Sequence, residues 1–418
     1  MIYKLAVILP SPYTGGVVRS LTNICRMLVL GARRCGDDMQ LIVGLPKTQS
    51  WSLQNAEVFD ELGIQTRFFE QKPISRESLI GSYTRHGIDT SVELPAEAIC
   101  FEDGIANFED ADFWYLISDA VQGQIPAHRK YACMVYDYAW RYVPEILSED
   151  QWCAFQYRAA ATAGANFVVT TTRQARRDVI NFAGADPERV QVFPIEFDPI
   201  EVDEAGGGLD DPCPFEFGSF VLWPTILSGH ENHDAVLKEL EAFLERNDLR
   251  VIIVGKGTAS FDPENTSPSM QHPYVQSVRN IVASSKILRS RLVFLDFVSD
   301  ELLLTLMRRA LCVLHTSRGD NGSYTVVEAA WQGTPALSNR YPAMEDVGEY
   351  FGLPLEFFDY YRPGSLANEL QRLQKIRADL CRRLPSREDL ASFAYDALAE
   401  RYWQLFVMNM RKALGQQP

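Results

Sequence analysis

Two acidic residues, Asp320 and Glu328, have types and a spacing suited to binding a polyol. Carboxylates are strong acceptors for paired hydroxyl groups, so one acid can bind a sugar and the other a ribose. They lie on either side of a small polar loop and the start of a helix expected near Ser323. An isolated pair at this spacing is more typical of a helix cap and a surface ion pair. The strands predicted before and after this segment favour the ligand site.

The same loop is suited to binding phosphate groups through its main chain. Backbone N–H groups at a helix N-terminus lack intrahelical partners, and the helix dipole places positive potential there. Gly322 lets the backbone approach a ligand closely. The amides expected to hold a diphosphate are those of Asn321, Gly322, Ser323, Tyr324 and Thr325.

Three further candidates lie where predicted strands end. Asp137 follows the apolar strand YACMVY and either faces a cleft or caps a turn. Arg19, just past GlyGly at 15–16, either reaches a phosphate or stays on a helix surface. Lys256, in the turn after the strand 250–254, is either a phosphate ligand or a solvated lysine.

The elements that position these residues alternate between short apolar strands and longer helical stretches. The strands expected in the first half are 4–9, 40–44, 114–117, 131–136, 167–170 and 190–193. Those expected in the second half are 220–223, 250–254, 311–315 and 335–337. Near-continuous apolar strands separated by helices predict parallel sheets covered on both faces. In such sheets, ligands bind at the carboxyl ends of the strands.

The alternation stops and restarts once, which predicts two domains. Residues 198–214 contain three glycines in a row, three prolines and a cluster of acids, a composition typical of a linker. We therefore expect Rossmann-like domains over 1–200 and 201–390. A terminal helix, 391–418, is expected to pack back on the first domain.

Composition argues against several classes of protein. The net charge of -15, with no basic face or tail, argues against a nucleic-acid partner. No apolar stretch approaches the roughly 20 residues that span a bilayer. The eight cysteines form no CxxC pair and no His/Cys cluster, which indicates a reduced, zinc-free, cytoplasmic protein.

The segment DNGSYTVVEAAWQGTPALS resembles the E-x7-E donor-site signature of retaining GT-B glycosyltransferases of family 4. These are the glycosyl transferases group 1, of the type that builds bacterial polysaccharides, and their pattern runs roughly EGFG…VEAMACGTPVVAS. Three other segments follow in the family's order: FVLWPTILSGHENH, VIIVGKGT and LVFLDFVSDELLLTLMRRA. GlyGly at 15–16 resembles the family's N-terminal glycine loop. The resemblance covers most of the second domain and little of the first.

This resemblance implies two Rossmann-like, doubly wound parallel-sheet domains that face a central cleft. It implies that Glu328 binds the donor ribose and Asp320 the transferred sugar. Tyr136 and Asp137 stand where the family has a His–Asp pair, and with Asp320 they are the candidate catalytic residues. The other donor contacts it suggests, besides the loop amides, are Gly15, Gly16, Arg19, Lys256, His230, Phe297 and Val298.

The sequence departs from the family's pattern at the phosphate-binding positions. The family's Arg and Lys align near Thr225 and Glu231, and neither residue is basic. A carboxylate beside a diphosphate is repulsive, so Glu231 is expected to point away, be neutralised or serve a different ligand geometry. Substitute bases are His230, His233 and Lys256, of which Lys256 is the first choice.

The expected activity is retaining, metal-independent transfer of a hexose or deoxyhexose from a nucleotide-diphosphate donor. The acceptor is a saccharide or a lipid-linked saccharide of a surface glycan, met in the cytoplasm or at the inner face of the cell membrane. No cofactor is expected. Because the basic pair is missing, the alternative is a catalytically weak GT-B-fold partner or scaffold of a glycan-assembly complex. A sugar epimerase or a phosphorylase is a third interpretation, and the sequence selects neither a donor base nor an oligomeric state.

Overall fold

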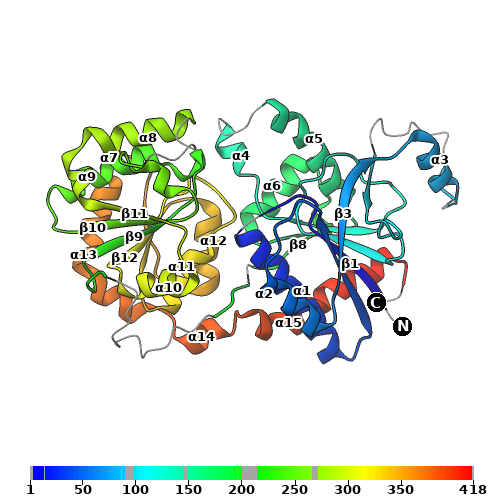
Figure 1. The fold of residues 1–418 in the computed structure, drawn as a ribbon. Coiled ribbons are helices and arrows are strands. Elements are labelled where there is room, and N and C mark those ends of the chain that lie inside the picture. The colour runs from blue at the N-terminus through cyan, green and yellow to red at the C-terminus, as the bar shows by residue number, and fades with distance from the viewer. Residues whose placement is uncertain are drawn as a thin grey trace. The chain divides into compact units, whose positions relative to one another are not determined.

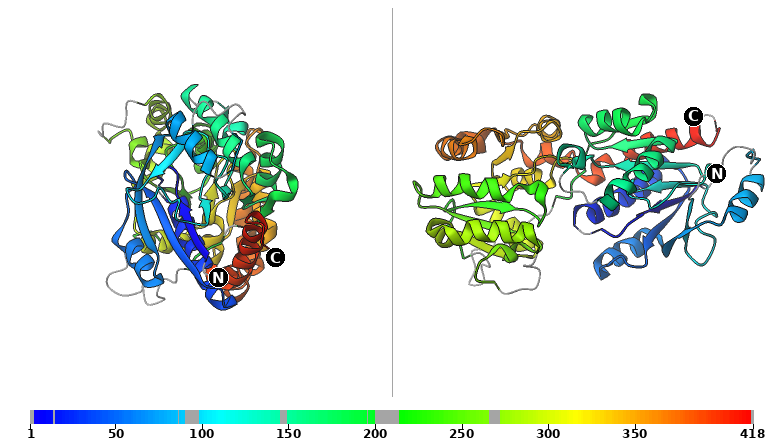
Figure 2. Two further views of the ribbon diagram at one scale, coloured as in Figure 1. Left: turned by 90° about the vertical axis from the view of Figure 1, so that its right-hand side faces the viewer. Right: turned by 90° about the horizontal axis from the view of Figure 1, so that it is seen from above.

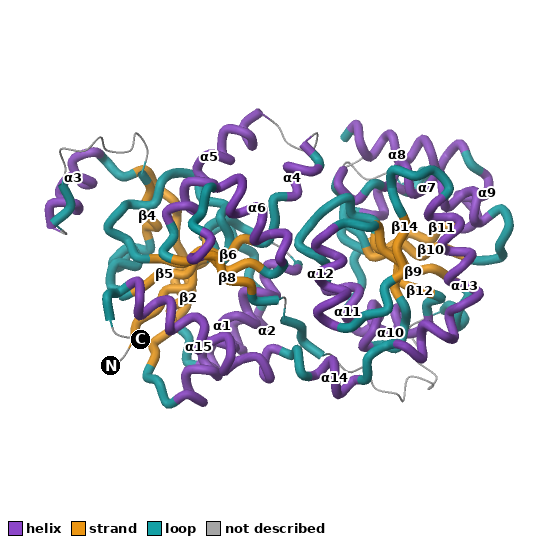
Figure 3. Tube along the Cα trace, turned by 180° about the vertical axis from the view of Figure 1, so that it is seen from behind, coloured by secondary structure: helices purple, strands orange, loops and turns teal. Residues whose placement is uncertain are grey.

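The computed structural model describes residues 3–13, 15–85, 87–89, 98–144, 149–194, 196–199, 214–265 and 272–416. The chain divides into two compact units. Unit 1 contains Met1–Tyr138, Leu147–Asp198 and Ser392–Pro418, and unit 2 contains Ala139–Ile146 and Pro199–Ala391. In each unit strands lie between layers of helices (Figure 3). The three glycines at 206–208, on which the predicted linker rests, lie outside the described residues.

Unit 1 contains one eight-stranded sheet with the strand order β4-β3-β2-β1-β5-β6-β7-β8. Its strands are β1 (Tyr3–Ile8), β2 (Met39–Pro46), β3 (Gln65–Pro73), β4 (Ile99–Glu102), β5 (Phe113–Leu116), β6 (Tyr131–Val135), β7 (Phe167–Thr170) and β8 (Val190–Val192). All neighbouring strands are parallel except β3 and β4, which pair antiparallel. The predicted parallel sheet therefore carries one antiparallel edge strand.

The helices of unit 1 include one from the far end of the chain. They are α1 (Gly16–Cys35), α2 (Leu53–Leu62), α3 (Arg76–Arg85), α5 (Glu149–Gly164), α6 (Arg173–Ala183) and α15 (Tyr395–Ala413). Helix α15, red in Figure 2, packs along α1 and against the sheet. Its Trp403 and Phe406 are fully buried, and the Tyr402 hydroxyl lies 2.7 Å from that of Tyr115 on β5.

Unit 2 contains a six-stranded, fully parallel sheet with the order β11-β10-β9-β12-β13-β14. Its strands are β9 (Phe220–Pro224), β10 (Arg250–Val254), β11 (Leu292–Asp296), β12 (Cys312–His315), β13 (Ala336–Asn339) and β14 (Glu356–Phe358). Most of their residues are buried, as expected for a sheet covered on both faces. The carboxyl ends of all six strands share one edge of the sheet, which positions the loops described below.

Helices cover both faces of the sheet in unit 2 (Figure 1). The helices are α4 (Ala139–Tyr142), α7 (His233–Leu244), α8 (Pro273–Ser284), α9 (Lys286–Arg291), α10 (Asp300–Arg309), α11 (Tyr324–Trp331), α12 (Pro342–Phe351), α13 (Ser365–Arg383) and α14 (Arg387–Ala391). Helices α7, α8, α9 and α13 share one apolar core with the sheet. Helices α10 and α11 pack together on the other face, with α11 against β12 and β13. None of the helices in the described part of the chain has the length and apolarity to cross a bilayer.

Candidate active site

The turn between β12 and α11 holds Asp320 through three neighbouring groups. The Tyr341 hydroxyl donates to Asp320 Oδ1 at 2.6 Å, and the Gly322 amide donates to the same oxygen at 2.7 Å. His315 Nε2 lies 3.4 Å from Asp320 Oδ2 and 2.9 Å from the Tyr341 oxygen. Because Tyr341 gives its proton to Asp320, its oxygen accepts from His315, so His315 carries a proton on Nε2.

These contacts keep Asp320 ionised. Burial acts to raise the pKa of Asp320, but the hydrogen bond and charge of His315, with Tyr341 and Gly322, lower that pKa to about 2. Burial acts to lower the pKa of His315, and the hydrogen bond and charge of Asp320 raise it above its ordinary value. A carboxylate has roughly four acceptor positions. Among the residues that the structure describes, Oδ2 has only His315 as a partner, at 3.4 Å, so it is the oxygen best placed to accept a ligand hydroxyl.

Gly322 gives this turn its shape. Its φ of 84° lies in the left-handed region, and a Cβ there would come within 2.3 Å of Val347 Cγ2. Ser323 follows as the N-cap of α11, and its hydroxyl accepts from the Thr325 amide at 3.2 Å. The amides of Gly322 and Thr325 are therefore used inside the turn. Binding of a diphosphate by the five amides of this loop stays a prediction.

Glu328 lies one helical turn into α11 and is 8% exposed. The Glu328 side chain is therefore not on the open surface of the helix, as the alternative interpretation assumed. Asp320 and Glu328 thus belong to one turn and the helix that follows it, at the carboxyl end of β12 (Figure 1).

The loop after β9 resolves the apparent conflict at Glu231. This side chain points inward, because Glu231 is only 7% exposed and Thr225 Oγ1 donates to its Oε2 at 3.3 Å. Thr225 Oγ1 also lies 2.9 Å from His233 Nε2, and His233 Nδ1 lies 2.6 Å from the Tyr274 hydroxyl. Burial, with the nearby charge of His230, lowers the pKa of His233 to about 3, so its ring is neutral. A neutral ring donates from one nitrogen to Thr225 and accepts on the other from Tyr274.

This β9 loop is tied to the β12 loop through the main chain. The Arg318 amide donates to the His230 carbonyl at 2.8 Å. Within the loop, His230 Nε2 lies 3.3 Å from Glu231 Oε1, and His230 Nδ1 lies 2.7 Å from Ser228 Oγ. Both nitrogens of the predicted substitute base His230 therefore have partners inside the loop.

Arg318 is a basic residue at this edge that the sequence did not single out. Its guanidinium reaches the Gly229 carbonyl at 3.4 Å and lies 5.7 Å from the centre of the Tyr360 ring. It therefore lies beside the turn that contains Glu231, where the family has a base. Arg318 could have been identified from the sequence, because it lies two residues before Asp320 in the expected donor loop.

The loops after β10 and β11 form the next part of the same edge. Lys256 is exposed and forms no hydrogen bond or ion pair with the residues that the structure describes. Phe297 is 77% exposed, and Val298 is half-buried. A Cβ on Gly255 would lie 1.8 Å from the Thr225 carbonyl oxygen, so the β9 and β10 loops touch at backbone level. Lys256 is thus on the loop next to the one that contains His230, and Phe297 and Val298 are on the loop after β11, one strand further along the sheet.

Comparison with known proteins identifies the family of the domain that contains these loops. Residues 220–387 match the family model described as glycosyl transferases group 1. The second unit contains a glycosyl transferases group 1 domain. A search of the curated proteins found no match.

Solved structures resemble the chain over nearly its full length. A glycosyltransferase from Rickettsia africae is 12% identical with a TM-score of 0.63, and 99% of each chain is covered. HepE from Anabaena in complex with UDP is 16% identical with a TM-score of 0.62, covering 98% of this chain and 100% of that chain. Sucrose-phosphate synthase from Thermosynechococcus elongatus is 14% identical with a TM-score of 0.64, covering 97% and 98%. The two α/β units match GT-B glycosyltransferase structures, which confirms the predicted fold class.

In unit 1 of this GT-B chain, the N-terminal glycine loop lies at the carboxyl end of β1. Gly15 has a φ of 67°, and α1 begins at Gly16 without a side-chain cap. Both glycines are exposed, and Arg19 is half-buried in the first turn of α1. The structure therefore places these three predicted donor contacts together at one helix N-terminus.

The end of β6 contains two of the predicted catalytic residues. The Tyr136 hydroxyl is buried, its ring packs against the apolar core, and burial raises its pKa far above the ordinary value. The catalytic role of Tyr136 stays a prediction. Asp137, the next residue, is half-buried, and its charge acts on the pKa of Tyr13, a residue of the β1 loop.

An ion pair that the sequence did not reveal lies at the same edge. Arg158 on α5 donates from Nε and Nη2 to Asp119 Oδ1 at 3.1 and 2.6 Å, and Asp119 follows β5. The Tyr13 hydroxyl lies 2.8 Å from Ser118 Oγ. These residues come from three separate segments, so no local spacing could have shown that they meet.

Proposed function

We propose that this protein is a nucleotide-sugar-dependent glycosyltransferase. The observation that carries the proposal is the β12–α11 turn of the group 1 domain. In that turn an ionised Asp320 lies beside the N-terminus of α11, and a second acid, Glu328, is buried on the same helix. Glu231 is buried and accepts from Thr225, so it need not face the diphosphate, while the scaffold alternative still rests on the missing basic pair.

The donor in this proposal is a nucleoside diphosphate hexose or deoxyhexose. Asp320 Oδ2 accepts a hydroxyl of the transferred sugar, and Glu328 accepts from the ribose. The N-terminus of α11 faces the diphosphate, with Lys256 and Arg318 as the nearby cations. HepE structures with UDP and with UDP-glucose support this class of donor, so UDP-glucose is the first compound to test.

The proposed reaction is retaining and needs no metal ion. As the bond from sugar to phosphate breaks, negative charge grows on the leaving diphosphate, and the fixed dipole of α11 stabilises it there. The acceptor hydroxyl, from a saccharide or a lipid-linked saccharide, attacks from the side of the leaving group. In this scheme Asp137 orients that hydroxyl or takes its proton.

The direct test combines donor binding with transfer. Calorimetric titration of the full chain with UDP-glucose and with other nucleotide sugars identifies the donor, and transfer to saccharide acceptors is followed with and without a chelator. Asp320→Asn and Glu328→Gln are each expected to lower kcat/KM by about 10²-fold, because each removes a charge aimed at the bound donor. Proton NMR of the product reports its anomeric configuration.

The matched control is Glu345→Gln. This acid is exposed and pairs with Arg340, so its substitution should leave transfer unchanged. Absence of binding to every nucleotide sugar would favour the scaffold. Binding with unaltered rates in both acid variants would remove Asp320 and Glu328 from the site.

A further inference from the structure

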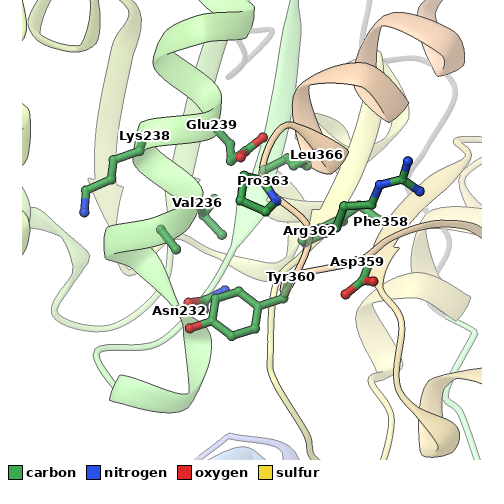
Figure 4. A pocket seen from close by; sticks show the side chains of 11 residues that line it. Asn232, Val236, Lys238, Glu239, Phe358, Asp359, Tyr360, Arg362, Pro363 and Leu366 are labelled. Carbon is green, nitrogen blue, oxygen red and sulfur yellow. The ribbon is translucent and has the colours of Figure 1, made fainter.

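A pocket of about 240 Å³ lies in unit 2 between α7 and the connection from β14 to α13 (Figure 4). Its lining contains none of the donor contacts described above, although the Arg318 guanidinium lies 5.7 Å from the centre of the Tyr360 ring at its edge. Its lining comes from the first turns of α7, which begins after Asn232, and from the segment 358–366. The same figure shows Glu239 close to Pro363 and the Tyr360 ring close to Asn232.

Two side chains fix the segment that forms the pocket wall. Glu239 on α7 accepts from the Gly364 amide at 2.5 Å through Oε1 and lies 3.4 Å from the Ala367 amide through Oε2. Glu239 therefore caps the N-terminus of α13. At the other end, Asn339 Oδ1 accepts from the Tyr360 amide at 3.1 Å. The wall is held at both ends, so the pocket is a built feature of the fold.

The lining is apolar at its base and polar at its rim. Val236, Phe358 and Leu366 are buried and supply the base. Tyr360 is half-buried above them, and its ring centre lies 4.9 Å from that of Tyr361, which is 82% exposed. This combination presents aromatic surface both inside the pocket and beside its mouth.

The charges at the rim balance each other. Lys238, Asp359 and Arg362 are exposed, and none of the three forms an ion pair with a residue that the structure describes. The fourth charged group, Glu239, is occupied by the end of α13. A strongly charged ligand gains little from two cations beside two acids, whereas a neutral polyol can use both donors and acceptors.

We propose that this pocket binds one sugar ring of a saccharide chain. The C–H face of a pyranose packs on an aromatic ring as apolar surface, while its hydroxyls bond to the planar polar groups of Asp359 and Arg362. The volume is below the roughly 300 Å³ at which sites for larger ligands begin, so it fits a single ring and excludes a dinucleotide-sized ligand.

The pocket is next to the candidate donor turn without being part of it. Asn339, which fixes Tyr360, also donates from Nδ2 to the Ser317 carbonyl at 3.0 Å, in the loop that leads to Asp320. Asn232 follows Glu231 directly in the sequence. The inference rests on the proposed glycosyltransferase function, which supplies the saccharide: the ring in the pocket is a unit of the acceptor or product chain.

The test uses the full-length protein and methyl glycosides of glucose, galactose and mannose as probes. Saturation-transfer NMR is expected to detect at least one glycoside, with its signal strongly reduced in Tyr360→Ala and in Arg362→Ala. Loss of the aromatic or guanidinium contact should weaken binding about tenfold. Arg382→Ala, at the exposed far end of α13, is the matched control and should keep the signal.

Calorimetry with UDP-glucose on the same variants separates this inference from the proposed function. Donor binding that persists in Tyr360→Ala and Arg362→Ala, with glycoside binding lost, supports the pocket. Glycoside binding that is absent, or unchanged in both variants, overturns the pocket while leaving the donor site intact. Failure of UDP-glucose and every other nucleotide sugar to bind the unaltered protein is the separate failure of the proposed function.

Discussion

Tyr341 joins His315 to Asp320. Its hydroxyl donates to Asp320 and accepts from His315, so Tyr341→Phe breaks both contacts without changing the ring. We expect kcat/KM for the donor to fall about tenfold, since a hydrogen bond to a charged group contributes roughly 1.5–3 kcal/mol. With one donor fewer, the pKa of Asp320 rises, so the acid limb of the pH–rate profile moves to higher pH.

The pH–rate profile distinguishes a positioning role from general destabilisation. A variant that only unfolds more easily keeps the shape of the profile while losing amplitude. An unchanged profile and an unchanged rate in Tyr341→Phe would show that Asp320 does not depend on this hydroxyl.

The ion pair of His315 with Asp320 predicts a specific dependence of stability on pH. The pKa of His315 is raised above 6.5, so its contribution is complete below pH 6.5 and is lost as pH rises through the raised value. The pKa of Asp320 is lowered from 3.8 to about 2, so its contribution is present above 3.8 and is lost as pH falls toward 2. Between those limits the pair contributes fully.

His315→Gln removes the charge and keeps a side-chain N–H. The difference in the free energy of unfolding between the two proteins should therefore be largest between pH 3.8 and 6.5 and shrink as pH rises through the raised pKa of His315. Urea unfolding at a series of pH values measures it. A difference that does not shrink as pH rises would mean that His315 is neutral in the folded state.

The sequence could identify the donor turn but not the groups that hold it. Asp320, Gly322 and Glu328 lie within nine residues, and their spacing is a local property of a loop and a helix. Tyr341 comes from beyond the next strand, and its contact depends on β13 lying beside β12. Neighbouring strands are a property of the whole sheet, which explains why this side chain was missed.

At the scale of elements, all ten expected strands are present, whereas β3, β4, β11 and β14 were missed. Strand β3 (QTRFFEQKP) combines two adjacent phenylalanines with polar and charged residues, a pattern that does not look like a buried parallel strand. Its Arg67 is buried against Asp110, with both of its Nη atoms 2.9 Å from the carboxylate oxygens. The partners that allow this burial lie far away in the sequence.

Helix packing in unit 1 depends on a close approach at Gly31. A Cβ at this position of α1 would lie 2.3 Å from the Ala399 carbonyl oxygen and 2.5 Å from Trp403 Cβ, both on α15. We expect Gly31→Ala to lower the free energy of unfolding by about 1–3 kcal/mol, because α15 must shift outward. Thermal or urea unfolding of unit 1 measures the change.

Gly81→Ala is the matched control. Gly81 is also a helical glycine of unit 1, but a Cβ there meets no atom within 4 Å. This substitution should stabilise by roughly 0.5–1 kcal/mol through helix propensity alone. Equal effects of the two substitutions would show that the contact between α1 and α15 is looser than described.

For the whole molecule, the GT-B fold class was predictable because the alternation of strands and helices runs through both halves. The terminal helix was expected to pack on the first domain, and the structure identifies the residues that make the contact. Helix α15 supplies Tyr402, Trp403 and Phe406 to the core of unit 1. Each large buried aromatic contributes roughly 3–5 kcal/mol, so the three together contribute about as much as the whole stability of a typical domain.

Truncation after residue 391 should therefore unfold unit 1 and leave unit 2 folded. Hydrogen exchange followed by mass spectrometry measures this unit by unit. Amides of β1 and β2 should lose protection, while those of β9 and β12 keep it. Retained protection in β1 and β2 would show that the core of unit 1 forms without α15.

The position of α15 near the end of the chain also determines which unit can finish folding first during biosynthesis. A ribosome releases β1 and α1 first, yet the surface that they offer to Trp403 and Phe406 stays uncovered until residues 395–413 emerge. By then every strand of unit 2 has already left the exit tunnel. The half of the protein that is made first is thus the half completed last, and during that interval its apolar face is open to chaperones.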